Sequence, residues 1–414
     1  MKHLPYFVSI LILLVDSRCD AEMRAGIAVR IVTPEPLLPI TGGVGPSNPV
    51  SRKEDDLTVR ALVLDDGPTR VAIVSTDFLG FPSALGNRVR AKAKSVAGTN
   101  ILIGATHTHS APDTYGFPDG KGGFAIDTNY VEMVCSKAAE AINEAASKLQ
   151  PVTLKIGTGE AKGKIAYNYY AEQLYDPRCH VIQAIGADGK PMATLVNYAI
   201  HPEVLGSKVG ILSPDLIGPL YTRIHEKGGG IGIFMNSAQG GMVTADNRVS
   251  NGKDARAWSE CVRIGTLLAD ETLRIAEGAS VQKEPRISCL ARMVSFPVES
   301  PLLLAVMKAS PLGLPGDSGN RVTTQMNLVN IGTAQILTIP GEALPNIGFY
   351  LKRKMRGEHN FLFGLTNDGF GYILTKVDWN SFKRYDYITR TCLGEMTGEI
   401  LIEEALKLVD AGSR

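Results

Sequence analysis

Two histidines separated by a single residue are the strongest chemical signal in this sequence. His107 and His109 follow a short apolar run, Ile101 to Ile103, and precede the loop-forming residues Ser110 to Asp113. In an extended chain, residues two apart point to the same side. Two imidazoles side by side at a strand end suit a metal such as zinc, but an isolated H-x-H is more often a hydrogen-bonded polar pair. The surrounding sequence has to decide between these two interpretations.

Two further residues stand where an apolar strand ends. His201 follows the apolar run Val196 to Ile200 and is followed by Pro202, although a lone histidine in such a place is usually structural. Glu342 follows Pro340-Gly341, where it serves either as an acidic residue at a helix N-terminus or as a carboxylate beside the histidines. Two histidines and one glutamate are a common zinc set that leaves one position open for water.

The remaining candidates carry weaker signals. Tyr372 ends the glycine-rich stretch 367–372, which taken alone predicts a turn. His180 and His225 stand in polar or helical contexts, and His359 lies in a charged segment. We therefore expect these three histidines at the surface.

Four segments, in this order, resemble the neutral, non-lysosomal ceramidases. They are ATHTHS at 105–110, the strand-end histidine near the middle of the chain, IPGE at 339–342 and N-x-x-x-x-Y at 367–372. LSPD at 212–215 is also similar to a family segment. The resemblance extends from about Ala25 to Asp386, which is nearly the whole chain after its N-terminal segment.

The resemblance also implies roles for individual residues. It implies four zinc ligands, His107, His201, Glu342 and Tyr372. It places His109 opposite the substrate and the attacking water. A tyrosine in an Arg-Tyr-acidic context contacts the substrate in the family, and this corresponds to Tyr385 with one residue of extra spacing.

The implied activity is zinc-dependent hydrolysis of the amide bond of ceramide or a related N-acyl lipid. Zinc polarises the carbonyl and lowers the pKa of its bound water to roughly 7. His109 is the expected general base and then the acid to the leaving amine, while Tyr372 or Tyr385 stabilises the oxyanion. One alternative is a secreted, ceramidase-like zinc-binding protein without turnover. Another is an amidohydrolase barrel, but that fold carries H-x-H on its first strand, whereas several strands and a helix precede His107.

Two departures from the family pattern stand out. The family has a segment N-A-G-N-x-S-P whose serine is a proposed nucleophile, and the matching stretch here, 238–244, has Val243 at the serine position. A hydroxyl nucleophile is then possible only on Thr244, by a shift of one residue. The zinc-water route needs no serine, so it is unaffected. We also expect the C-terminal β-sandwich domain of ceramidases to be absent.

Composition bounds the class of protein. The 414 residues are 44% hydrophobic and 21% charged, with a formal net charge of +1, which indicates a folded protein without an electrostatic footprint for nucleic acid. Residues 1–21 predict a signal peptide, because Met1-Lys2-His3 precedes the apolar run Leu4 to Val15. No second long apolar run occurs, so we expect residues 22–414 to be a soluble, secreted or periplasmic catalytic domain. The five cysteines after Cys19 are scattered and predict mostly small buried residues.

The periodicity predicts mixed helices and strands without strict alternation, and hence a single mixed α/β domain. Strands are expected at 25–33, 57–64, 71–74, 101–103, 152–156, 181–185, 193–198 and 231–234, with a further strand pair over 328–339 and a strand at 361–365. Helices are expected at 83–96, 130–149, after 213–215, and at 254–277, 343–354 and 393–409.

Overall fold

A large mixed sheet forms the centre of the molecule. The computed structural model describes residues 22–249, 252–313 and 319–412, so the expected signal peptide over 1–21 lies outside the described residues. The main strand order is β13-β11-β10-β8-β1-β4-β5-β6, with β15 added beside β8. The strands are β1 (Arg24–Ile31), β4 (Thr58–Asp65), β5 (Arg70–Thr76), β6 (Ile101–Ala105), β8 (Gln150–Glu160), β10 (Arg178–Gly186), β11 (Pro191–Tyr198), β13 (Ile231–Asn236) and β15 (Ser280–Val281).

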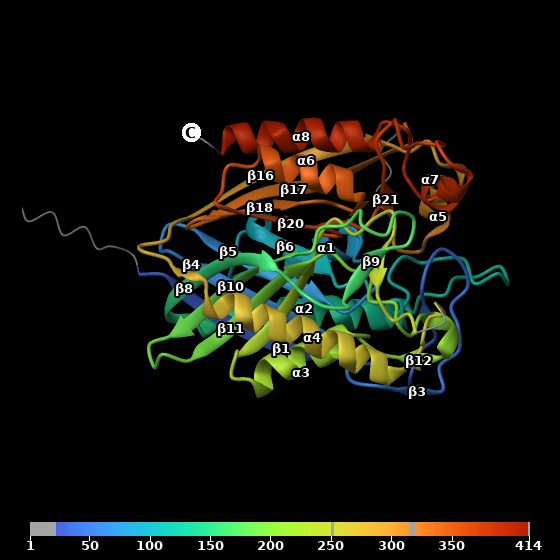
Figure 1. The fold of residues 1–414 in the computed structure, drawn as a ribbon. Helices are drawn as coiled ribbons and strands as arrows, with labels where there is room; N and C mark the ends of the chain where they lie inside the picture. The colour runs from blue at the N-terminus through green and yellow to red at the C-terminus, as the bar shows by residue number, and fades with distance from the viewer. Residues whose placement is uncertain (1–21, 250–251, 314–318, 413–414) are drawn as a thin grey trace, which may run out of the picture.

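A smaller sheet of four strands packs face to face on this sheet (Figure 1). Its order is β16 (Ile287–Pro297), β17 (Arg321–Ile331), β18 (Ala334–Thr338) and β20 (His359–Phe363). Phe361 and Phe363 of this sheet share one buried apolar cluster with Ile73 and Leu195 of the large sheet. The apolar alternation of both sheets therefore produces a common core between them.

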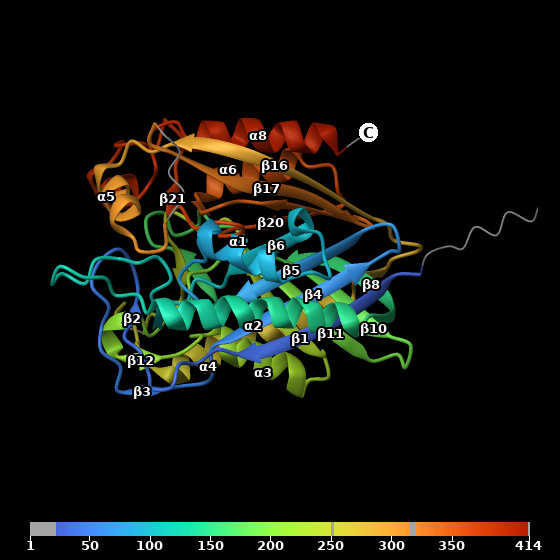
Figure 2. The same ribbon diagram turned by 180° about the vertical axis from the view of Figure 1, so that it is seen from behind.

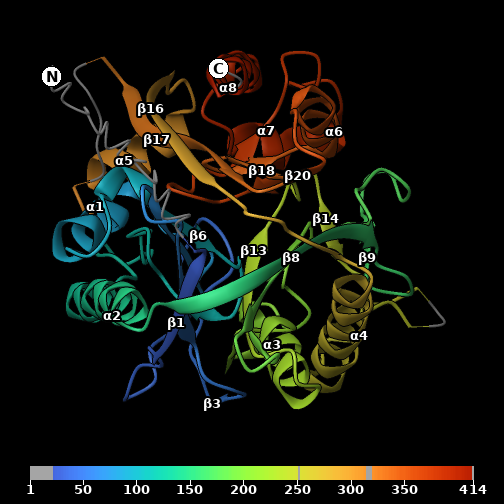
Figure 3. The same ribbon diagram turned by 90° about the vertical axis from the view of Figure 1, so that its left-hand side faces the viewer.

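Helices cover the two outer faces, so the molecule has four layers (Figures 2 and 3). Clusters of buried apolar residues join the large sheet to four helices, α1 (Ser83–Lys92), α2 (Thr128–Ser147), α3 (Ile217–Glu226) and α4 (Trp258–Glu277). On the opposite face, α6 (Pro345–Lys354) and α8 (Thr397–Ala411) cover the smaller sheet. Two short helices, α5 (Pro301–Ala309) and α7 (Asp386–Arg390), lie at the end of the molecule where β21 (Tyr372–Ile373) is found (Figure 1).

The large sheet curls until the ends of β6 and β13, its two outermost strands, come close to each other. The Asn236 side-chain amide, at the end of β13, donates to the Thr106 carbonyl at 3.0 Å and to the Ile200 carbonyl at 2.7 Å. Thr106 directly precedes His107, and Ile200 directly precedes His201. A single buried amide thus brings the two strand-end histidines to one place.

Four short ladders arrange the loops beyond the strand ends. They are β2 (Ile40–Thr41) with β7 (Ala111–Pro112), β3 (Arg52–Lys53) with β12 (Ile211–Leu212), β9 (Ala166–Asn168) with β14 (Val243–Ala245), and β19 (Glu342–Ala343) with β21. In the last pair Glu342 lies directly opposite Tyr372. The loop that follows β20 also reaches β6, because Thr366 forms an isolated bridge with Gly104.

The single mixed α/β domain predicted from the sequence is confirmed, and most of the predicted helices and strands are present within a few residues of the expected bounds. The exception is β17, which begins at Arg321, whereas the strand pair was expected to begin at Leu328. The sheet pairing rules out an amidohydrolase barrel for the described residues, because most neighbouring strands of the large sheet are antiparallel. Sequence reasoning missed β16 and α5. In β16, buried and exposed residues alternate only weakly, and the apolar Met293 is exposed. The two-residue period that marks a strand is therefore not visible in this part of the sequence.

Two histidines expected at the surface are not there. His180 lies buried in β10, where its Nε2 accepts from the buried Lys352 ammonium at 2.8 Å. His359 begins β20, and its Nδ1 lies 2.9 Å from the Thr158 hydroxyl, which also contacts His180. The prediction of surface positions failed because the polar residues beside each histidine in the sequence do not show that another part of the chain packs over it. His225 is exposed on α3, as expected.

Among the described residues, the five cysteines are unpaired and four of them are buried, which agrees with small core residues. Within the same ranges, no helix has both the length and the apolar character needed to cross a membrane.

Candidate metal centre

His107 is held rigidly at the turn that follows β6. Its φ of +75° is in the left-handed region, which is uncommon for a residue with a side chain and is characteristic of functional sites. Its backbone N–H donates to the Phe78 carbonyl at 2.9 Å. Its Nδ1 contacts the Leu79 carbonyl, which can only accept a hydrogen bond, so Nδ1 carries the proton and Nε2 has a free lone pair.

His201 is oriented in the same way from the end of β11. Its Nδ1 lies 2.8 Å from the Val243 carbonyl, so its Nε2 also has a free lone pair. The loop after His201 is held by the buried Asp215 carboxylate, which accepts hydrogen bonds from the backbone N–H groups of Val204 and Leu205. Metal-binding histidines typically donate their second ring nitrogen in this manner.

Glu342 faces both imidazoles. Its Oε2 lies 3.3 Å from His107 Nε2 and 3.1 Å from His201 Nε2. Burial alone would raise the pKa of Glu342, but protonated imidazoles of His107 and His201, through their charge and hydrogen bonds, hold it well below its usual range. Two lone pairs pointing at one carboxylate oxygen repel it unless a cation, either a proton or a metal ion, lies between them. This donor set therefore fits a metal ion in its chemistry.

His109 completes a group of three histidines. One ring nitrogen from each of His107, His109 and His201 lies within 4.8 Å of the others, a spacing that a metal ion can bridge. His109 Nε2 is buried without a hydrogen-bond partner, while its Nδ1 lies 3.7 Å from Glu203 Oε2. Burial lowers the pKa of His109 to about 3, so its ring is neutral and keeps a lone pair at neutral pH.

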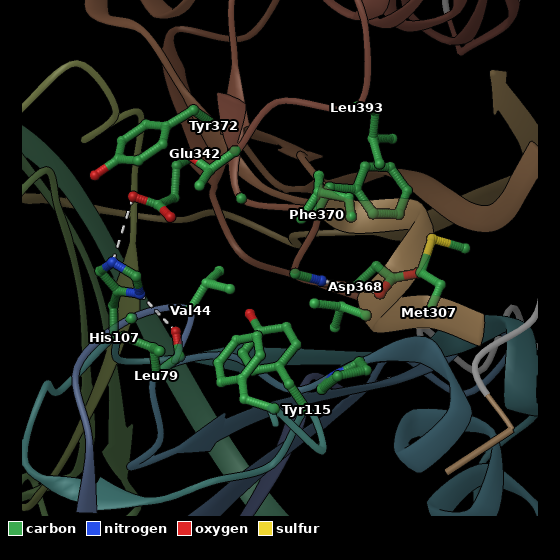
Figure 4. A pocket seen from close by; sticks show the side chains of 18 of the residues that line it. Val44, Leu79, His107, Tyr115, Met307, Glu342, Asp368, Phe370, Tyr372 and Leu393 are labelled. Carbon is green, nitrogen blue, oxygen red and sulfur yellow. Dashed lines mark hydrogen bonds and ion pairs between the residues drawn. The ribbon is translucent and has the colours of Figure 1, made fainter. Parts of the chain in front are cut away.

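Tyr372 lies beside Glu342 on the neighbouring strand (Figure 4). Its hydroxyl lies 3.3 Å from Met242 Sδ, and burial together with the Glu342 carboxylate raises its pKa well above the ordinary value. The phenol is therefore protonated in this geometry. The structure thus gathers the four residues of the expected ligand set, and the role of each in metal binding stays a prediction.

Tyr385 is not among the residues that line the pocket beside this centre. It lies in a 3-10 turn before α7 and packs on Tyr170 and Phe382, with ring centroids 5.2 Å and 5.3 Å away. Two residues later, Tyr387 lines the pocket and packs edge to face on Tyr372, with centroids 5.9 Å apart. Burial and the nearby Glu342 raise the pKa of Tyr387 to about 12, so its hydroxyl keeps its proton. Of Tyr385 and Tyr387, Tyr387 is thus the one that lines the pocket.

An apolar pocket begins at this centre and extends away from it (Figure 4). His107, Glu342 and Tyr372 line one end, and most of the remaining lining is apolar, with Ser83, Asp368 and Thr391 as polar exceptions. The apolar lining includes Val44, Leu79, Phe117, Leu303, Val306, Met307, Phe370 and Leu393. Three of these residues come from α5, whose N-terminal Ser300 caps the helix. We call this cavity the apolar pocket.

Val243 and Thr244, the two residues considered in place of the serine of the ceramidase segment, both make contacts that maintain the structure. Val243 is fully buried in the apolar cluster under α3 and α4, and its carbonyl orients His201. The Thr244 hydroxyl donates to Glu203 Oε1 at 2.6 Å. Neither side chain carries an activated hydroxyl directed at the apolar pocket.

Four contributors to the site escaped sequence reasoning: Asn236, Glu203, Tyr387 and α5. Asn236 and Glu203 act through contacts with residues far away in the chain, for which the sequence has no local signal. The helix α5 does have one, because Ser300-Pro301 followed by an apolar run is a capped helix start.

The fold is similar to that of solved ceramidases. The structure of neutral ceramidase from Pseudomonas aeruginosa superposes with a TM-score of 0.74 at 17% identity, covering 95% of this chain and 75% of the other. A structure described as a ceramidase complexed with C2 gives the same score and identity, with 95% and 76% covered. No family profile matches the sequence. No curated protein matches it either. At this identity the likeness establishes the fold.

Proposed function

We propose that this chain is a zinc-dependent hydrolase that cleaves the amide bond of ceramide or of a related N-acyl lipid. One observation carries the proposal: two imidazoles, each with its Nδ1 donated to a carbonyl, direct their free Nε2 atoms at Glu342 beside an apolar pocket. The similarity of the fold to ceramidases supports the choice of substrate class.

The residues that would hold the metal are His107, His201 and Glu342, with Tyr372 as a fourth ligand. Zinc, when bound, supplies a Lewis acid that polarises the amide carbonyl and acidifies a water molecule. The carbonyl contacts of Leu79 and Val243 fix the ring orientation of both histidines before the metal arrives.

His109 is the proposed base, because its ring is neutral and its buried Nε2 has no hydrogen-bond partner. The Nε2 lone pair takes the proton of the attacking water and then returns it to the nitrogen of the leaving amine. Glu203, 3.7 Å from His109 Nδ1, stabilises the imidazolium that exists between these two transfers.

Tyr387 is the proposed donor to the carbonyl oxygen of the substrate, in the role that the sequence suggested for Tyr385. Its hydroxyl is protonated and it lines the apolar pocket beside Tyr372. A phenol that donates to the developing oxyanion lowers the barrier without changing its own charge. The apolar pocket then accommodates the acyl chain, whose burial contributes about 0.8 kcal/mol per methylene.

We also propose that residues 1–21 are a signal peptide and that residues 22–414 are the mature catalytic domain, in a secreted or periplasmic location. The apolar run Leu4 to Val15 supports this proposal. N-terminal sequencing of the protein from the producing cell should give a mature N-terminus close to Glu22. A mature protein that retains Met1 would contradict it.

The activity is tested with the purified protein. Metal content is measured by mass spectrometry, and hydrolysis is measured on a panel of N-acyl lipids before and after chelation and zinc return. We expect about one zinc per chain and amide hydrolysis that follows zinc occupancy. Bound zinc without hydrolysis of any N-acyl substrate would favour a binding protein that keeps the fold without turnover.

A further inference from the structure

The helix α5 has two apolar faces, and the protein covers one of them. Its sequence, PLLLAVMKA, contains a single charged residue, Lys308. The side chains on the covered face that line the apolar pocket are Leu303, Val306 and Met307. The exposed apolar side chains, at the helical spacing i, i+3 and i+7, are Leu302, Ala305 and Ala309. An apolar helix face that remains in contact with water is a common sign of an interaction site.

A hairpin over residues 117–125 extends beside α5 at the same end of the molecule (Figure 2, teal). Phe117, at the base of the hairpin, belongs to one buried apolar cluster with Val306 of α5. Phe124, on the second arm of the hairpin, is 38% exposed, as is Leu302 of α5. Both elements thus line the apolar pocket on one side and present apolar side chains to solvent on the other. We call α5 and this hairpin together the rim.

The exposed charges of the rim suit phosphate groups. Lys121, at the tip of the hairpin, and Lys308 of α5 are both exposed. Within the described part of the chain, neither ammonium forms an ion pair with a carboxylate. The one carboxylate of the hairpin, that of Asp119, accepts from the backbone N–H groups of Lys121 and Gly123 at 2.7 Å and 2.9 Å. It is therefore directed into the hairpin, while the two ammonium groups remain available to an anionic surface.

We propose that the rim docks this protein on the surface of a lipid bilayer that contains anionic phospholipids. The inference rests on the proposed function, whose substrate carries a long acyl chain. Leu302 and Phe124 enter the boundary between head groups and acyl chains, and Lys121 and Lys308 contact the lipid phosphates. Because the rim forms a wall of the apolar pocket, docking brings the pocket next to the membrane that holds the substrate. This continuity with a pocket for an acyl chain, together with the two cations, favours a bilayer over a protein partner.

Vesicle flotation with zinc-loaded protein tests the apolar contact. We expect the protein to float with vesicles of phosphatidylcholine and phosphatidylglycerol. The double variant Leu302→Ser/Phe124→Ser should bind them about tenfold more weakly, because two apolar side chains no longer leave water. Val262→Ser is the matched control, since Val262 is 41% exposed on α4, and it should bind like the unmutated protein. An unmutated protein that stays with the buffer, or a double variant that binds equally well, would overturn the proposal.

The charge contact is tested in the same assay. Lys121→Gln/Lys308→Gln should weaken binding to the vesicles with phosphatidylglycerol by about tenfold, since each lysine near an anionic surface contributes to binding. Binding to vesicles of phosphatidylcholine alone should be unchanged in this variant. Lys227→Gln, at the exposed end of α3, is the matched control. Full binding by the double lysine variant would contradict the choice of an anionic bilayer.

Activity separates docking from chemistry. On an N-acyl lipid in these vesicles, hydrolysis by Leu302→Ser/Phe124→Ser should fall about tenfold, in step with its binding. On a dissolved N-hexanoyl amide, kcat/KM should equal that of the unmutated protein, because neither residue lines the apolar pocket. Vesicle binding without hydrolysis of any amide would remove the proposed function and keep the docking surface. Hydrolysis in vesicles that the double variant leaves unchanged would do the reverse.

Light scattering tests the other occupant of an apolar surface, a second copy of this chain. We expect a monomer both before and after the substitutions at Leu302 and Phe124. A dimer that the two substitutions dissociate would assign the rim to contact between copies and overturn the proposal.

Discussion

His201 Nε2 and Glu342 Oε2 lie 3.1 Å apart, although the two residues follow strands of different sheets. His201 follows β11 of the large sheet, and Glu342 follows β18 of the smaller one. The contact therefore exists only when the two sheets are packed on each other. The candidate metal centre is a product of the tertiary fold.

Replacing either histidine that faces Glu342 should remove the metal. For His107→Ala or His201→Ala, we expect zinc content near zero by mass spectrometry and loss of amide hydrolysis, because each variant lacks an imidazole lone pair at the centre. His225→Ala, on the exposed side of α3, is the matched control and should keep both. A variant with full zinc occupancy would exclude that residue as a ligand.

His109→Ala should separate chemistry from metal binding. We expect zinc to remain while kcat falls by about 100-fold to 10,000-fold, the usual effect of a lost acid or base group. Zinc content and kcat are measured on the same preparation. Because His109 lies within 4.8 Å of the other two histidines, loss of zinc would show instead that it is a ligand.

Val243 should matter for stability and not for chemistry. Val243→Ala leaves the carbonyl that orients His201, so kcat should change little, while the lost buried methyl groups cost about 1–2 kcal/mol in unfolding free energy. Val243→Ser should bring no gain in activity. A covalent acyl-enzyme trapped on Thr244 would show that the water mechanism is wrong, and Thr244→Ala is the control for that outcome.

Asn236 should control the metal centre without touching the substrate. Asn236→Ala leaves the Thr106 and Ile200 carbonyls without their donor, so we expect a loss of about 3 kcal/mol in unfolding free energy and weaker zinc binding. Urea unfolding and zinc titration measure the two effects. Asn87→Ala, at an exposed position of α1, should change neither. Unchanged zinc affinity in Asn236→Ala would limit the role of Asn236 to stability.

His180 should make the protein sensitive to acid. Burial and the Lys352 ammonium lower the pKa of His180 well below 6.5, so the folded state keeps the ring neutral while the unfolded state protonates it. The unfolded state thus binds more protons below about pH 6.5, and stability is lost as the pH falls, by up to about 1.4 kcal/mol per pH unit. In urea unfolding between pH 5 and 8, His180→Gln should show a shallower decline than the unmutated protein. An equal decline in both would contradict this assignment.

Local patterns of apolar and polar residues predicted most strands and helices, and they also predicted that the candidate metal ligands stand at strand ends. His107, His201 and Glu342 were identifiable because each follows an apolar run that stops at a break. Contacts between distant segments were not identifiable, and Asn236 is an example, since its amide joins two loops remote from it in the chain.

The difference between Tyr385 and Tyr387 has another origin. Both tyrosines belong to one short helical region, where a step of two residues turns a side chain to the opposite side. Spacing in the sequence locates the pocket-lining tyrosine only to within a few residues. The packing of α7 determines which of the two side chains enters the pocket.

Because the proposed ligands come from both sheets, the centre cannot assemble on a partial chain. His107 and His201 are synthesised well before Glu342, and their rings converge on it only after β18 has packed on the large sheet. Under the proposed function, metal binding is thus a late event in biogenesis. For a chain exported before folding, the metal would be chosen by the supply outside the cytoplasm, and not by the cytoplasmic pool present during translation.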